Sequence, residues 1–390
     1  MSGGTTLGEI AELQTGFPFK SAEFSTDPSA VRLLRGDNIA QARIRWTNAA
    51  RWSAGGIDQR YELREGDVVV AMDRPWIEAG LKYASISQSD LPSFLVQRVA
   101  RLRAKAGTNQ RYLHYVIGSA DFTRHVLSQQ TGTGIPHISG SQILSFRLPD
   151  RSPSEQQAIA EVLGALDDKI AANGSVIAAT ERLMLSLAGT AVSQATVAEL
   201  ATQSTQAISP ASFDTSVAHF SLPAFDAGAV PEQVDGIQIK SNKFLLAEPS
   251  VLVSKLNPRI PRSWNVSALP AAMSLASTEF VVLAPSGIST SALWAALSRP
   301  EVAAELATHV AGTSGSHQRI KPATVLQLTV PDPRSLAPDS LATVDALGET
   351  THAYREESQL LSSTRDELLP LLMSGNVRVR DAEKTVEAVV

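Results

Sequence analysis

Two long stretches with seven-residue periodicity constrain this chain most. In the first, Leu163, Ile170 and Ile177 recur at intervals of seven, and a second set runs three positions on from Leu166. This spacing places both sets on one stripe of a helix. Ser152, followed three residues later by Glu155, is typical of a capped helix start, and Gly189 is a natural stop. At 1.5 Å per residue, a helix over 154–188 is about 50 Å long.

A second stretch with the same period closes the chain. Its Leu347 and Leu368 each lie 181 residues after a leucine of the first stretch, Leu166 and Leu187, so the apolar positions of the two stretches are in register. Polar Asn173 and Thr180 on the first stripe correspond to Tyr354 and Leu361 on the second, so neither stripe is fully apolar. We therefore expect the two helices to pack on each other, antiparallel, with pseudo-twofold symmetry; the alternative is two unrelated amphipathic helices, each covering its own domain. The residues predicted to pack are Leu163, Leu166, Ile170, Ile177, Met184, Leu347, Tyr354, Leu361 and Leu368.

The segments before the two helices also repeat. Apolar runs at 68–72 and 251–254, helical patterns at 112–126 and 290–310, and Gly-rich loops follow in the same order in both halves. The fold class is therefore α+β, a tandem duplication of a mixed α/β domain followed by a long helix. The predicted boundaries are a first domain at 1–151, a helix at 152–190, a second domain at 191–334, a helix at 335–375 and a tail at 376–390.

Composition narrows the functional classes. The chain has 390 residues and no cysteine, which excludes disulfides and thiolate chemistry. No apolar stretch is long enough to span a bilayer and no signal-like N-terminus is present, so we expect a cytoplasmic protein without membrane contact. Residues 1–150 carry 17 basic against 14 acidic residues, +3, and residues 191–334 carry 9 against 10, −1, within a total of −5. An acidic total argues against indiscriminate coating of nucleic acid but leaves room for a local basic face.

No catalytic constellation is evident. The chain lacks a Walker loop, a dinucleotide fingerprint and the Asn/Asp-Pro-Pro-aromatic motif of adenine methyltransferases, and its seven histidines have no metal-ligand spacing. Asp167-Asp168-Lys169 superficially resembles a nuclease carboxylate cluster, but on a helix face it is more simply surface charge. We expect a protein without catalytic or metal residues of its own.

The binding signals lie in two loops that combine Arg, Pro and Trp after a strand. Such loops suit DNA because Arg pairs bidentately with guanine or phosphate, and Lys and Asn supply further donors. Gly-rich segments with nearby cations add backbone N–H groups for phosphates. The alternative is that Trp76 and Trp264 are core residues and that the arginines are merely solvated. The predicted DNA-binding residues are Arg35, Arg74, Trp76, Lys82, Arg101, Arg103, Thr133, His137, Lys255, Asn257, Arg259, Arg262, His317, Arg319 and Lys321.

The sequence resembles the specificity subunits of type I restriction-modification systems. Residues 153–160 and the run LGALDDKI at 163–170 look like the start of that family's spacer helix, and LRGDNI at 34–39 and Thr131-Gly132-Thr133 look like its target recognition domain. The second half departs from the pattern: 247–250 lacks the Gly-Asp strand entry, and the second helix lacks the Glu-Gln start.

The resemblance implies a non-catalytic subunit that reads a bipartite double-stranded DNA target with its two domains. It implies that the helices set the spacing of the half-sites and dock methyltransferase (M) subunits, with restriction (R) subunits completing the complex. S-adenosylmethionine and ATP are then expected on those partners, and no cofactor in this chain. Two other hypotheses stay open: a protein-interaction scaffold with duplicated binding domains and no DNA, and an enzyme with an unrecognised site.

Overall fold

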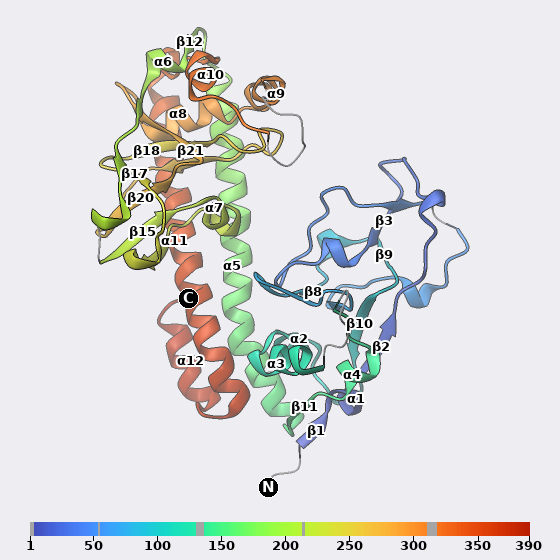
Figure 1. The fold of residues 1–390 in the computed structure, drawn as a ribbon. Helices are drawn as coiled ribbons and strands as arrows, with labels where there is room; N and C mark the ends of the chain where they lie inside the picture. The colour runs from blue at the N-terminus through green and yellow to red at the C-terminus, as the bar shows by residue number, and fades with distance from the viewer. Residues whose placement is uncertain (1–3, 54, 130–135, 213–214, 310–317) are drawn as a thin grey trace. The chain divides into compact units, whose positions relative to one another are not determined.

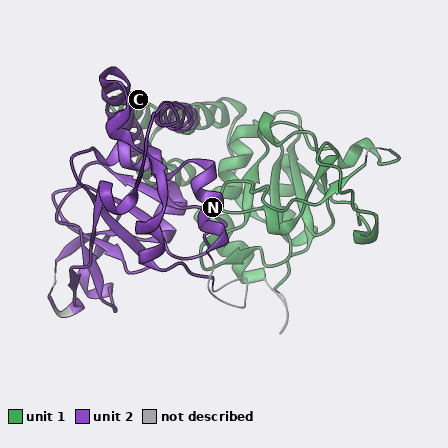
Figure 2. Ribbon diagram, turned by 90° about the horizontal axis from the view of Figure 1, so that it is seen from above, with its two compact units in different colours: residues 1–168, 362–390 green, residues 169–361 purple. Residues whose placement is uncertain are grey.

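The chain divides into two compact units. The computed structural model describes residues 4–53, 55–129, 136–212, 215–309 and 318–390. Unit 1 comprises residues 1–168 and 362–390, and unit 2 comprises residues 169–361 (Figures 1 and 2). This division cuts through both long helices, so each unit contains one globular region and a part of each helix.

The globular region of unit 1 is built on an antiparallel sheet with the strand order β2-β10-β5-β8. Its centre is the continuous apolar run of β5, whose four residues are all buried, as expected for a strand covered on both faces. A smaller sheet, β4-β3-β9, contains one parallel pair. The strands of unit 1 are β1 (Gly4–Thr6), β2 (Ala11–Thr15), β3 (Val31–Leu34), β4 (Arg51–Trp52), β5 (Val68–Ala71), β6 (Trp76–Ile77), β7 (Gly80–Leu81), β8 (Tyr83–Ser85), β9 (Ser93–Leu95), β10 (Val99–Ala104) and β11 (Arg147–Pro149). Its short helices are α1 (Leu7–Ile10), α2 (Gln110–Gly118), α3 (Ala120–Gln129) and α4 (Gly140–Leu144).

The globular region of unit 2 repeats this plan. Its main sheet has the order β13-β21-β18-β19, which matches that of unit 1 strand for strand. The smaller sheet is enlarged to five strands, β14-β17-β20-β15-β16, and again contains one parallel pair. The strands are β12 (Gln194–Thr196), β13 (Ala201–Ser204), β14 (Ala207–Ile208), β15 (Ser216–Phe220), β16 (Glu232–Asp235), β17 (Lys243–Leu245), β18 (Ser250–Ser254), β19 (Ser263–Val266), β20 (Met273–Ser277), β21 (Phe280–Pro285) and β22 (Thr329–Pro331). The helices are α6 (Val197–Leu200), α7 (Leu222–Gly228), α8 (Thr290–Leu297), α9 (Pro300–Thr308) and α10 (Pro322–Gln327).

The duplication extends to single hydrogen bonds. The first strand of each unit pairs antiparallel with its last short strand, Gly4 with Pro149 in unit 1 and Gln194 with Pro331 in unit 2. The first residue of the following helix makes an equivalent backbone hydrogen bond in each unit: Leu7 N donates to Phe146 O, and Val197 N donates to Leu328 O. The tandem duplication predicted from the sequence is confirmed at this level of detail.

Two local predictions were wrong. The helix expected over 112–126 is broken at Ser119, whose hydroxyl donates to Val116 O and accepts from Phe122 N, ending α2 and starting α3. The helix expected from Thr290 is broken at Arg299, because Pro300 follows and disfavours helical backbone in the residue before it.

The two long helices are α5 (Pro153–Ala188) and α11 (Pro338–Ser374). The predicted cap at the start of α5 is present: Ser152 N and Oγ both donate to Glu155 Oε2, at 2.9 and 2.8 Å. Gly375 follows α11 at φ 79°, a conformation that favours glycine. The tail contains a short helix, α12 (Val379–Glu387), which buries Ala382 and Val386.

Each unit contains an antiparallel contact between α5 and α11. In unit 1, Arg365 on α11 pairs with Asp167 on α5 at 2.8 Å, while Arg151, just before α5, donates to the carbonyl of Leu372. In unit 2, Thr180 lies against Thr351 at 2.9 Å. Residue numbers rise on one helix as they fall on the other, so the predicted antiparallel packing is confirmed within each unit. The pseudo-twofold relation concerns the placement of the units and stays a prediction.

The side chains at this seam differ in one respect from the pattern expected. The sequence suggested that polar residues of one stripe would face apolar residues of the other. Instead, buried Asn173 donates to Glu357 Oε2 at 2.7 Å, and buried Thr180 meets buried Thr351. Polar residues pair with polar residues because a buried donor without a partner is costly.

Candidate nucleic-acid interface

The loop that follows β5 in unit 1 is held by the backbone against residues 136–138. We name residues 73–82 exit loop 1. Arg74 N donates to Pro136 O at 2.8 Å and Ile138 N donates to Met72 O at 2.9 Å, so Asp73 and His137 form an isolated antiparallel bridge. The start of exit loop 1 is therefore fixed beside the segment that ends the Gly-rich stretch.

Asp73 organises the charges at this bridge. Its Oδ1 lies 2.7 Å from His137 Nδ1, and its Oδ2 accepts from Arg98 Nη1 at 2.6 Å. Partial burial raises the pKa of Asp73, but the hydrogen bonds from His137 and Arg98 outweigh it and leave that pKa below its ordinary value. Asp73 is thus ionised at neutral pH and engages both neighbours.

The rest of exit loop 1 is a small hairpin, β6–β7, whose first strand is apolar. Trp76 and Ile77 are exposed, at 38% and 41%, which is unusual for large apolar side chains next to a core strand. At the end of the hairpin Lys82 is partly buried, and this burial lowers its pKa. No side chain in the part of the chain that the structure describes pairs with exposed Arg74.

The equivalent loop of unit 2, residues 255–262, is named exit loop 2. Asn257 N donates to Gln318 O at 2.9 Å and Ile320 N donates to Lys255 O at 3.0 Å, which reproduces the two backbone bonds of unit 1. Arg319 occupies the place of His137 and pairs with Glu279 at 2.8 Å. Burial lowers the pKa of Lys255, as it does that of Lys82.

Exit loop 2 differs from exit loop 1 in its second half. Arg262 is held bidentately by Asp226 at 2.7 and 2.9 Å, whereas Arg259 is exposed. Trp264 is not a loop residue, as the sequence suggested, but is 2% exposed in β19, where it packs among Phe220, Phe225 and Phe280. Of the two tryptophans, only Trp76 is therefore available on the surface.

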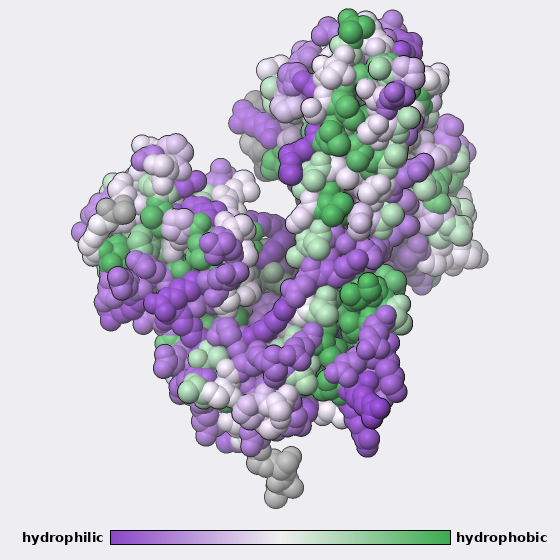
Figure 3. Space-filling model, turned by 180° about the vertical axis from the view of Figure 1, so that it is seen from behind, coloured by the Kyte–Doolittle hydropathy of each residue, from purple (hydrophilic) through white to green (hydrophobic). Residues whose placement is uncertain are grey.

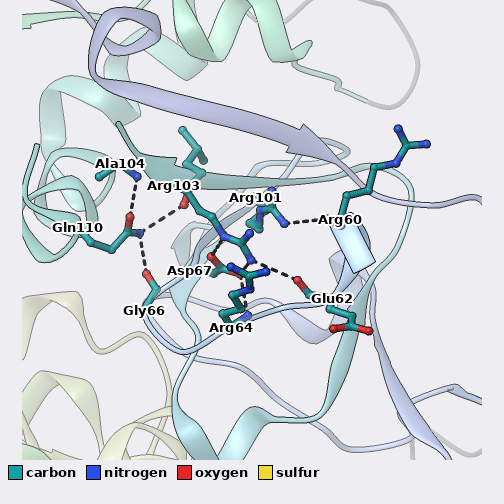
Figure 4. A network of polar contacts seen from close by, with 10 residues as sticks. Arg60, Glu62, Arg64, Gly66, Asp67, Arg101, Arg103, Ala104 and Gln110 are labelled. Atoms are coloured by element: carbon teal, nitrogen blue, oxygen red, sulfur yellow. Dashed lines mark hydrogen bonds and ion pairs between the residues drawn. The ribbon is translucent and has the colours of Figure 1, made fainter. Parts of the chain in front are cut away.

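Two of the predicted DNA-binding arginines, Arg101 and Arg103, lie on strand β10 of the unit 1 sheet. Arg101 is 7% exposed and donates to Arg60 O, while Arg103 forms two bonds, of 2.5 and 2.8 Å, to buried Asp67 (Figure 4). Asp67 also accepts from Arg64 N at the turn into β5. These arginines are engaged in holding strand β10 to that turn, and their predicted role at DNA has no support from this geometry.

The remaining predicted residues are scattered or not described. Arg35 pairs with Asp37 at 2.8 Å at the end of β3, and Lys321 is exposed at the start of α10. Thr133 and His317 lie outside the described residues. The structure thus brings together Arg74, Trp76, Lys82 and His137 in unit 1, and Lys255, Asn257, Arg259, Arg262 and Arg319 in unit 2.

Of the residues predicted to pack between the helices, five are buried, Leu163, Leu166, Met184, Leu361 and Leu368, and four are half-buried, Ile170, Ile177, Leu347 and Tyr354. Met184 belongs to the hydrophobic core of unit 2, and Leu347 packs against that core. Other apolar side chains on the same helices are exposed, among them Leu183 at 46% and Leu360 at 54%. In the space-filling view, apolar side chains gather in patches between polar ones (Figure 3).

In the region that the structure describes, no three His, Asp or Glu side chains are placed to hold a metal ion. Asp167 and Asp168, the only candidate carboxylate cluster of the sequence, are bound by Arg365 and Arg111. Likewise, no helix among the described residues is long and apolar enough to cross a membrane.

The chain resembles known proteins in part of its sequence and in its fold. No family model matches it. It is 36% identical over 155 residues, 39% of this chain and 26% of the relative, to the type I restriction enzyme EcoAI specificity subunit of Escherichia coli. It is 29% identical over 167 residues, 42% of this chain and 39% of the relative, to the MjaVIII specificity subunit of Methanocaldococcus jannaschii. It thus spans well under half the length of these curated relatives.

Among solved structures, the type I restriction-modification S subunit from M. genitalium matches 95% of this chain and 96% of its own, with a TM-score of 0.52 and 13% identity. At that identity the likeness concerns the fold, which confirms the α+β architecture with its two long helices. The chain is therefore homologous, over part of its length, to the specificity subunits of type I restriction enzymes, and it has their fold.

Proposed function

We propose that this chain is the DNA-specificity subunit of a type I restriction-modification complex. In this proposal each unit reads one half of a split double-stranded DNA target through its exit loop. The paired helices keep the half-sites at a set spacing and dock the methyltransferase subunits, and restriction subunits join the complex.

The observation that carries the proposal is the duplicated exit loop. Exit loop 1 follows β5 and exit loop 2 follows β18, which occupy equivalent places in the main sheets of their units. Two equivalent backbone hydrogen bonds hold each loop against the end of a Gly-rich stretch. Each presents cations or donors from a rigid scaffold, which is how loops on a sheet acquire binding roles. Homology to specificity subunits supports DNA as the ligand.

The chemistry of the complex then belongs to its partners. S-adenosylmethionine is expected on the methyltransferase subunits and ATP on the restriction subunits, while this chain supplies sequence recognition and no catalytic residue. A scaffold that binds only protein through its duplicated units is the competing hypothesis, and nothing in the geometry favours it.

Co-expression of the chain with the methyltransferase subunits of its own system tests the proposal. We expect methylated adenines to be confined to a split motif in the host DNA and to be lost when this chain is omitted. Binding of the complex to a duplex with that motif should weaken steeply as salt rises, because Lys and Arg contacts release counterions. Methylation without a split motif, or binding that does not respond to salt, would contradict the proposal.

A further inference from the structure

We infer that Arg74 and Asn257 are paired specificity residues, Arg74 reading a G·C pair for unit 1 and Asn257 an A·T pair for unit 2. The inference rests on the proposed function and specifies its chemistry. Its basis is that both residues occupy one structural position, in an unusual backbone conformation, at the start of the exit loops.

The equivalence follows from the hydrogen-bond register. Ala71 N bonds Lys82 O and Met72 N bonds Arg98 O in unit 1; Ser254 N bonds Arg262 O and Lys255 N bonds Glu279 O in unit 2. Three residues beyond the first donor of each unit, Arg74 N bonds Pro136 O and Asn257 N bonds Gln318 O. Ala71 with Ser254, Met72 with Lys255 and Arg74 with Asn257 differ by 183 in each case, so the two loops align without a gap up to this point.

Both residues have positive φ, 43° for Arg74 and 49° for Asn257. Asn tolerates this left-handed region, but Arg enters it rarely. Both also precede a proline, Pro75 and Pro258, and that position favours extended backbone instead. Among the described residues, Ala42, Asn48, Arg98 and Ala229 are the other non-glycine residues with positive φ. Of these, Arg98 has an equivalent residue in unit 2, Glu279, which accepts the corresponding backbone hydrogen bond. Glu279 does not have positive φ.

Strain retained at the same position in both copies points to a function of the side chain rather than to the fold. Glycine would adopt this conformation without cost, yet the two copies carry Arg and Asn. Positive φ directs the side chain differently from the neighbouring extended residues, and two backbone bonds fix its origin. A side chain that starts from a fixed backbone position suits base recognition.

The two side chains match the two purines. The Arg guanidinium pairs bidentately with the O6 and N7 of guanine, and the Asn amide pairs bidentately with the N6 and N7 of adenine. Arg74 is exposed and has no partner among the described residues. Asn257 is half-buried, and its buried Oδ1 has no hydrogen-bond partner in the described part of the chain, an unmet acceptor that a donor such as the adenine amino group would satisfy once the amide turns outward.

Other cations near the loops are less free to read bases. Arg98 is paired with Asp73, Arg262 with Asp226 and Arg319 with Glu279. Such pairs can still contact phosphates, but a bidentate base contact would first have to displace the carboxylate. Arg74 and Asn257 therefore stand apart from these paired cations, and their backbone conformation distinguishes them from exposed Arg259 as well.

Glycine variants separate recognition from folding. Arg74→Gly and Asn257→Gly remove the side chain and relieve the backbone, so each variant should fold with an unfolding midpoint at least equal to that of the wild type. The readout is the set of methylated motifs produced by the complex with its methyltransferase subunits, together with the Kd for the cognate duplex and for duplexes with single base-pair changes.

We expect Arg74→Gly to lose discrimination at one G·C pair of one half-site, by about 5- to 150-fold. Asn257→Gly should lose it by a similar factor at one A·T pair of the other half-site. Arg74→Lys should not restore discrimination, because Lys keeps the charge but not the planar fork. Asn48→Gly is the matched control: it has φ 56° and is exposed in unit 1, but it lies outside the exit loop and should leave the motif unchanged.

Two results would overturn the inference while leaving the proposed function intact. One is a wild-type split motif that both glycine variants reproduce unchanged. The other is a uniform loss of affinity for all duplexes that Arg74→Lys restores, which would identify a phosphate contact. If the wild-type complex itself yields no split motif, the proposed function fails first.

Discussion

Asp67 is the residue on which the turn into β5 depends. It is 3% exposed and accepts from Arg103 at Nε and Nη2 and from Arg64 N. Asp67→Ala leaves a partly buried guanidinium uncompensated, so we expect the free energy of unfolding of unit 1 to fall by on the order of 3 kcal/mol. Urea unfolding followed by tryptophan fluorescence measures this loss. The control Asp150→Ala, at an exposed carboxylate, should change it by less than about 0.5 kcal/mol.

His114 on α2 makes the stability of unit 1 depend on pH. Burial lowers the pKa of His114 to about 4, with Asp167 raising it and Arg365 and Arg111 lowering it further; the Tyr83 and Tyr115 rings pack beside it. The folded state therefore binds fewer protons than the unfolded state between the folded pKa of about 4 and the ordinary value of 6.5.

Stability should accordingly fall as the pH is lowered through that window, by on the order of 3 kcal/mol in total, since one pKa unit corresponds to ~1.4 kcal/mol. His114→Phe removes the titrating group and keeps a ring against Tyr83, so we expect a flatter curve of unfolding free energy between about pH 4 and pH 6.5. Urea unfolding at a series of pH values provides the measurement. An identical slope in the variant would show that other groups dominate.

At this scale the sequence predicted residue types better than their positions. The sequence does not tell which arginines of the segment 97–103 reach solvent. Arg103 is held by Asp67, 36 residues away in sequence, and Arg101 by the backbone carbonyl of Arg60. Conversely, the positive φ of Arg74 has a sequence signal only in retrospect, in the matching Arg-Pro and Asn-Pro steps of the two halves.

Among the elements, helix α11 contains two adjacent leucines that differ in burial. Leu361 is fully buried, whereas Leu360 is 54% exposed on the same helix. Leu361→Glu should lower the free energy of unfolding by about 3 kcal/mol or more, because it removes a buried side chain and buries a charge. Leu360→Glu is the control and should remain within about 0.5 kcal/mol of the wild type. Thermal unfolding monitored by circular dichroism compares the two, and equal midpoints would refute the assignment of the seam.

The long helices were predictable because a seven-residue period over 35 residues outweighs local irregularities. The shorter helices were not, because one side chain decides where they break: the Ser119 hydroxyl ends α2, and Pro300 separates α8 from α9. The pairing of polar residues across the seam was also beyond the pattern, since periodicity gives the face of a helix but not its register against a partner. Asn173 and Thr180 meet Glu357 and Thr351 only once that register is known.

For the whole molecule, the tandem duplication was predictable from the order of strand-like, helical and Gly-rich segments in the two halves. The equivalent backbone hydrogen bonds of the two exit loops now give the correspondence between individual residues. What the sequence could not supply was the correspondence within the loops. The second half lacks the Gly-Asp strand entry. Its Trp264 lies in a core strand, whereas Trp76 of the first half lies in the exit loop. Recognition that differs between two copies of one scaffold is what a split, asymmetric DNA target would require.

If the helix pair acts as a spacer, its length should set the gap between half-sites. Three added heptads, about 21 residues, lengthen a helix by about 31 Å, close to one turn of DNA. We therefore expect insertion of three heptads after Val176 and, to match the antiparallel partner, after Tyr354 to leave both half-sites unchanged and to widen the gap by about nine base pairs.

A single heptad in each helix adds about three base pairs, which turns the second half-site away by roughly a quarter of a turn or more, so methylation should be weaker than in the longer variant. Adenine methylation mapping in cells carrying each variant reads the gap directly, and an unchanged gap in the three-heptad variant would mean that the helices do not measure it.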